Sequence, residues 1–175
     1  MALQTAVTRQ VDAFDPAVLT IGHVVAGTRM NIIPETAVLE GTFRCVSDAR
    51  RAAMPGLIRR VVEGVAGAHG LSADIRFDEN YPVTVNDPAV VERVRAIASD
   101  LVGAGDVHEM PAPMMAAEDW SYVLQRIPGA MANLGARPRG RALEGFPQNH
   151  SSLVVFDEDA MAVGAALYAK VALEL

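Results

Sequence analysis

The chain has 175 residues, of which 51% are hydrophobic and 21% charged, a composition typical of a globular protein rather than a disordered one. Its formal net charge of -6 provides no basic surface, which argues against a nucleic-acid or anionic-membrane partner. No run approaches the roughly 20 apolar residues of a membrane helix, and no signal-peptide pattern opens the sequence. Because Cys45 has no second cysteine to pair with, we expect a cytoplasmic protein stabilised by packing.

The first 81 residues predict the order helix, strand, strand, helix, strand. Residues 2–11 read as a helix, residues 18–26 and 37–46 as strands, a helix follows the cap at Ser47 with its regular part starting near Pro55, and residues 72–77 form a further strand. A ferredoxin-like sandwich, two helices on an antiparallel sheet, would need one more strand in front. We therefore expect an α+β domain of that type without its first strand.

Residues 82–175 predict a second, α/β segment. Proline turns at 82 and 88 suit a linker. Beyond them we expect a helix over 88–102, a helix opened by Glu118 and Asp119 and broken at Pro128, a short buried strand over 130–134, a loop over 135–149 and a last helix over 157–173. The predicted organisation is thus two domains, residues 1–81 and 82–175.

Five polar residues are candidates for chemistry, and each also has a plain structural explanation. Glu118 and Asp119 stand in a helix start, where acids favour the helix dipole without any further role. His150 lies in a polar loop, where a solvated histidine is common. Asn31 suits a turn, and Arg44 points away from the apolar face of its strand, as a solvated side chain would.

Two other side chains predict packing rather than chemistry. His23 has the parity of the apolar residues of its strand, and we expect it to be packed or to lie at the sheet edge. Cys45 has the parity of Phe43, so we expect it in the core rather than as a reactive thiol. Spacing alone reveals no standard metal motif, nucleophile elbow or phosphate loop.

Six blocks in the same order resemble the amidohydrolase family that includes hippurate hydrolases, N-acyl-amino-acid amidohydrolases and auxin-conjugate hydrolases. Each block alone would be weak, but together they span nearly the whole chain. They are Val18 to Pro34, with GTRMNIIP at its end; Glu40 to Arg44, EGTFR; Tyr81 to Pro88, YPVTVNDP; Ala116 to Tyr122, AAEDWSY; Pro128 to Ala130, PGA; and His150 to Glu158, HSSLVVFDE.

The resemblance implies a two-domain hydrolase that cleaves the amide bond of N-acyl amino acids or small peptides with two divalent metal ions, zinc or manganese. His150 would be a metal ligand, while Asn31 and Arg44 would hold the substrate from a lid domain. Glu118 and Asp119 would lie near the metal site and contribute to substrate binding. The lid would pair two subunits into a homodimer, and residues 82–175 would be the C-terminal part of a zinc-peptidase-like catalytic domain.

Two departures from the family pattern affect that expectation. Ala116 and Ala117 replace a glycine pair, which restricts the backbone there. The general base and most metal ligands of the family lie in a segment that precedes the part matched here, so no catalytic residue is assigned in this chain and we expect it to be inactive alone. The alternative is a catalytically dead fragment that dimerises or binds a partner through its lid.

Overall fold

The computed structural model describes residues 1–78 and 80–174. Residues 1–84 and 112–122 form one compact unit, and residues 85–111 and 123–175 form another. Within the described residues, no helix is both long and apolar enough to cross a membrane. The elements in chain order are α1 (Ala2–Gln10), β1 (Ala17–Ala26), β2 (Ala37–Cys45), α2 (Asp48–Ala68), α3 (Pro88–Val102), the 3-10 turn η1 (Ala104–Asp106), α4 (Trp120–Leu124) and α5 (Ala160–Glu174).

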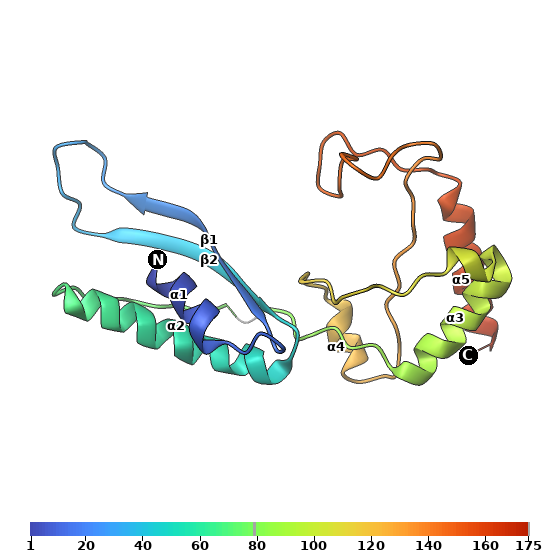
Figure 1. The fold of residues 1–175 in the computed structure, drawn as a ribbon, viewed down its shortest axis with the longest axis horizontal. Helices are drawn as coiled ribbons and strands as arrows, with labels where there is room; N and C mark the ends of the chain where they lie inside the picture. Colours follow the sequence, from blue (N-terminus) through green and yellow to red (C-terminus); the bar gives the residue numbers. More distant parts are fainter. Residues whose placement is uncertain (79, 175) are drawn as a thin grey trace. The chain divides into compact units, whose positions relative to one another are not determined.

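The first unit is a β-hairpin packed on two helices (Figure 1). Strands β1 and β2 pair antiparallel, with Ala17 opposite Cys45 and Ala26 opposite Ala37. The core lies at the open end of the hairpin, where Leu19 of β1 packs with Met54 and Ile58 of α2. The helices and the hairpin agree with the sequence prediction, so the α/β class is confirmed at this level.

A bulge interrupts the hairpin and shows that His23, expected to be packed or to lie at the sheet edge, is not packed. Ile21 pairs with Gly41 and His23 with Glu40, so Gly22 is the extra residue. The bulge reverses the alternation of side chains beyond it. His23 is therefore exposed, and its Nδ1 lies 2.5 Å from the Glu40 carboxylate instead of packing on the apolar face. Gly41 is required here, because a Cβ would lie 2.3 Å from the Thr20 carbonyl oxygen.

Helix α2 begins earlier than the sequence prediction placed it. Ser47 caps it by accepting a hydrogen bond from the Arg50 backbone N–H at 3.0 Å, and Pro55 lies inside the helix. A good cap and the burial of Met54 outweigh the one hydrogen bond that a proline removes. The regular helix thus starts seven residues before Pro55.

The strand predicted over residues 72–77 is wrong, because no ladder forms there among the described residues. The last side chain of this segment is nevertheless packed. Phe77 contacts the core and meets the ring of Phe43 edge-on, with centroids 6.4 Å apart. A strand needs a hydrogen-bonding neighbour as well as apolar alternation, and the described sheet contains only β1 and β2.

The second unit is built on α3 and α5, which pack together. Asp87 caps α3 by accepting from the Val90 N–H at 3.0 Å, and Pro88 follows in the first turn. The buried strand predicted over residues 130–134 is wrong, because this segment is partly or fully exposed and forms no ladder. The side chain of Asn86 takes the place of a strand partner: its Nδ2 donates to the Met131 carbonyl at 3.0 Å, and its Oδ1 accepts from the Met131 N–H at 2.8 Å.

Two further helices differ in length from the prediction. Helix α4 has five residues and ends at Leu124, four residues before Pro128, so proline is not what stops it. Helix α5 begins at Ala160, after a turn in which the Asp157 carboxylate accepts from the Asp159 N–H. None of its described side chains is buried although the helix is mostly apolar.

We expect Asn86→Ala to lower the free energy of unfolding by about 1 to 3 kcal/mol, because it removes both bonds to Met131 and leaves partly buried backbone groups without a partner. Urea unfolding followed by circular dichroism measures the change. Gln125→Ala, at an exposed position of the same unit, is the control. Equal effects of the two substitutions would contradict the bridging role of Asn86.

Candidate functional site

Arg44 anchors a distant segment of the first unit. The side chain points outward from β2, as its parity predicts, and Nη1 donates a hydrogen bond of 2.6 Å to the carbonyl oxygen of Met115. This bond joins the hairpin to the residues just before Glu118. Arg44 is therefore a structural tether as well as a candidate for anion binding, because a guanidinium has five N–H donors and this contact uses one.

The same segment is fastened at its other end by Tyr122. The Tyr122 hydroxyl donates to the Asn80 carbonyl at 2.9 Å, and its ring meets that of Tyr81 edge-on at 6.0 Å. Residues 112–122 are thus fastened, near both ends, to the rest of the first unit. Sequence reasoning missed this role of Tyr81 and Tyr122, although both belong to motif blocks that it singled out.

Glu118 and Asp119 lie between these two anchors. Glu118 is half-buried, and its carboxylate accepts from the Asp119 backbone N–H at 3.0 Å. The hydroxyl of Ser121, which is fully buried, donates to the Glu118 carbonyl at 2.6 Å. The Asp119 carboxylate is exposed. The turn therefore fixes the backbone of the acid pair and leaves Asp119 open to solvent.

Asn31 lies at the opposite end of the hairpin from Arg44. It occupies the connecting loop, in a turn closed by a bond of 3.3 Å from the Ile32 N–H to the Arg29 carbonyl. Ala37 and Arg44 of β2 are seven positions apart, a span of roughly 23 Å at 3.3 Å per residue. One small ligand cannot contact Asn31 and Arg44 of the same chain. The structure does not bring these two candidates together.

Among the described residues, His150 is the one non-glycine residue whose backbone is left-handed, with φ of 74°. It is the third in a series of turns spaced five residues apart, after Gly140 (φ 78°) and Gly145 (φ 71°). Each turn closes with a backbone bond of 3.1 to 3.2 Å, donated by Arg141, Phe146 and Ser151. The first two turns have glycine at the left-handed position, whereas the third has a histidine. The Cβ of the histidine makes this backbone conformation strained, and strained residues are typical of functional positions.

The described residues do not form a metal centre by themselves. No group of three or more histidine, cysteine, aspartate or glutamate side chains comes together within residues 1–78 and 80–174. A catalytic zinc generally has three protein ligands, so the exposed imidazole of His150 does not suffice. Cys45 is no substitute: it packs against the core, and burial raises the pKa of its thiol, which keeps it protonated at neutral pH.

The chain belongs to peptidase family M20/M25/M40, whose family model matches residues 5–174. This confirms the family that the motif blocks indicated.

Individual relatives carry hydrolase names. The chain is similar to thermostable carboxypeptidase 2 of Saccharolobus solfataricus, at 35% identity over 95% of this chain and 41% of that protein. It is similar to N-acetylcysteine deacetylase of Bacillus subtilis, at 31% identity over 97% of this chain and 42% of that protein. A crystal structure of a dinuclear metal binding peptidase of the M20 family from Bacillus subtilis superposes with a TM-score of 0.71 at 27% identity, over 98% of this chain and 44% of that one. The chain thus spans about two fifths of the length of these relatives.

We expect Arg44→Ala to loosen residues 112–122, because the bond to the Met115 carbonyl is lost. Hydrogen exchange measured by mass spectrometry should show faster exchange in this segment. Arg29→Ala, an equal loss of charge in the exposed hairpin loop, is the control. Unchanged exchange in residues 112–122 of Arg44→Ala would refute the tether.

We expect His150→Gly to be more stable than His150→Ala by about 1 kcal/mol, because glycine adopts a left-handed backbone without the Cβ clash. Urea unfolding of the two variants gives the difference. Ser152→Gly against Ser152→Ala is the matched comparison at a neighbouring position without positive φ. Equal stability of the His150 pair would mean that the turn carries no strain.

Proposed function

We propose that this chain is the C-terminal part of a metal-dependent amidohydrolase that cleaves the amide bond of N-acyl amino acids or small peptides. The observation that carries the proposal is the family match over residues 5–174 together with a strained, exposed histidine inside the last motif block. The names of the relatives, a carboxypeptidase and an N-acetylcysteine deacetylase, support hydrolysis of small amide substrates.

In this proposal residues 1–81 are a ferredoxin-like lid and residues 82–175 belong to the catalytic domain. His150 is a metal ligand, and the other ligands and the general base come from protein outside this chain. Zinc or manganese is the metal we expect, and the dinuclear metal binding neighbour supports a divalent metal. Glu118 and Asp119 contribute to substrate binding next to the segment that Arg44 tethers.

The distance between Asn31 and Arg44 shapes the proposed assembly. We propose a homodimer formed through the lid, in which each site is served by Arg44 of one chain and Asn31 of the other. The hairpin supports pairing, because each of its two strands has an edge without a partner among the described residues. In addition, every residue from 22 to 42 is exposed, including large apolar side chains that solvent would not normally contact.

A second candidate is a catalytically dead module that dimerises or binds a partner through its lid. The exposed apolar side chains of the hairpin, such as Met30 and Ile33, favour it. The two candidates differ in whether His150 matters. A binding module keeps its partner when His150 is replaced, whereas a hydrolase loses turnover.

A protein that joins this chain to the remaining three fifths or so of a family relative tests the proposal. With zinc or manganese we expect it to hydrolyse N-acyl amino acids, and we expect His150→Ala to lower kcat/KM by about 100-fold or more through the lost ligand. A ninhydrin assay of the released amino acid measures the rate. The 175-residue chain alone, with the same metals, should show no turnover. Full activity of the joined His150→Ala protein would exclude the metal-ligand role.

A further inference from the structure

The loop that carries His150 also borders an open hollow on the second unit, with a volume of about 510 Å³. That volume lies within the range of small-molecule sites, roughly 300 to 1,000 Å³. Two of the turns described above, at Gly140 and Gly145, contribute residues to its lining, and each is closed by a backbone hydrogen bond. Hydrogen-bonded turns therefore hold part of the lining in place.

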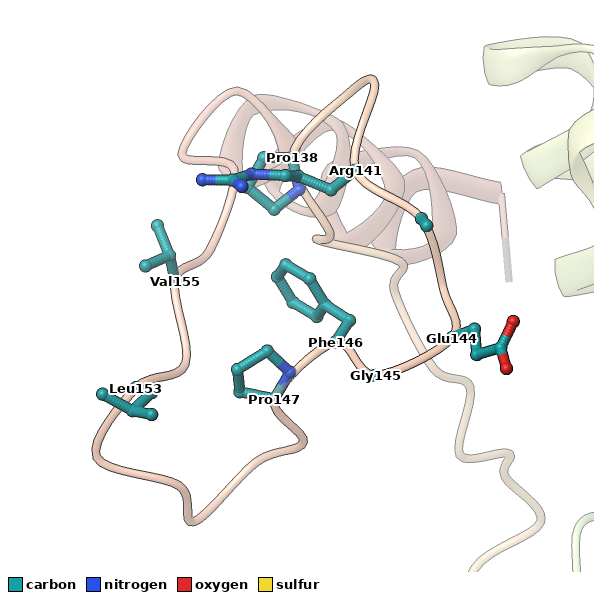
Figure 2. A pocket seen from close by; sticks show the side chains of 9 residues that line it. Pro138, Arg141, Glu144, Gly145, Phe146, Pro147, Leu153 and Val155 are labelled. Atoms are coloured by element: carbon teal, nitrogen blue, oxygen red, sulfur yellow. The ribbon is translucent and has the colours of Figure 1, made fainter.

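The lining combines an apolar floor with one cation. Figure 2 shows the rings of Phe146 and Pro147 facing the hollow, with Leu153 and Val155 on one side and the Arg141 side chain along the rim above Phe146. Glu144 also belongs to the lining, but its carboxylate points away from the hollow. The only charge presented to the hollow by its described lining is therefore the guanidinium of Arg141.

The local charge favours an anion. Residues 135–155 contain three arginines and one glutamate, which gives +2, whereas the whole chain has a formal net charge of -6. Arg141 makes no ion pair with any residue of the described part of the chain. A guanidinium next to an apolar surface is suited to a carboxylate attached to a hydrocarbon group, because the planar donors bind the carboxylate and the hydrocarbon is removed from water.

We propose that this hollow binds an apolar carboxylic acid, with the carboxylate on Arg141 and the hydrocarbon against Phe146, Pro147 and Leu153. Binding itself does not require the amidohydrolase activity, but its biological role rests on the proposed function. Amide hydrolysis releases the acyl group as a carboxylic acid. A site for such an acid, close to His150 in the sequence, would retain that product and select substrates with apolar acyl groups.

Phenylacetate is the probe, added to the isotopically labelled 175-residue chain without metal and followed by nuclear magnetic resonance. We expect saturable shifts confined to residues 138–155, with a dissociation constant on the order of 1 mM for so small a ligand. Acetate, which lacks the ring, and 2-phenylethanol, which lacks the charge, should each bind about tenfold more weakly.

Matched variants separate a site from general attraction. Arg141→Gln and Phe146→Leu should each weaken phenylacetate binding several-fold, while Arg139→Gln removes the same charge from a residue outside the lining and should change it less than about twofold. Phe146→Leu keeps an apolar side chain, so the loop stays folded. Equal loss in Arg139→Gln and Arg141→Gln, or equal binding of acetate, would overturn the proposal.

The outcome is independent of the hydrolase test. If phenylacetate binds as expected and the joined protein is inactive, the hollow stands and the amidohydrolase assignment fails. If the joined protein is active and phenylacetate does not bind, only the proposed acid-binding site is refuted, and the amidohydrolase assignment stands.

Discussion

The constraint that governs this molecule is that its two units bury few of their apolar side chains. Six hydrophobic residues are buried among those described: Ala6, Ala17, Leu19, Met54, Ile58 and Ile97. The accessible area is 13604 Å², against about 8,200 Å² for a compact monomer of this mass and about 9,900 Å² for two compact bodies of half the mass. Apolar surface is therefore left open to contact with other protein.

The excess surface is concentrated where interactions are expected. In the first unit it is the hairpin beyond the bulge, with Met30 and Ile33 almost fully exposed. In the second it is α5, a helix apolar on most of its sides, which is normally buried. Tyr168 and Leu173 of that helix are more than 80% exposed. Exposed apolar surfaces of this kind are typical of sites that contact other protein.

The sequence predicted elements whose stabilising contacts are local and missed those that depend on distant partners. Helices α1, α2, α3 and α5 and the β-hairpin followed from periodicity, and α2 also from its cap, because Ser47 bonds to a residue three positions away. The strands predicted at 72–77 and 130–134 did not form. Apolar alternation cannot reveal whether a pairing strand is present, nor that Asn86 binds Met131 from 45 residues away.

The candidate site shows the same division. Parity along β2 placed Arg44 outward, but its bond to Met115, 71 residues away, could not be read from sequence. A strict two-residue alternation also did not predict the bulge at Gly22, which places His23 on the opposite face of the sheet. The alternation of side chains along a strand does not show whether the candidate residues act together on one substrate, which stays a prediction.

The turns around His150 suggest why one loop would serve both chemistry and recognition. Glycines at 140 and 145 relieve backbone strain in two turns, so the wall of the hollow forms at little cost. The third turn concentrates the strain on His150, whose side chain is thereby presented from a backbone with few alternative conformations. A ligand position must be rigid to bind metal, and a pocket must be preorganised to bind a small acid, because both otherwise lose affinity to ordering. On the proposed function, this loop would meet both needs with one piece of backbone.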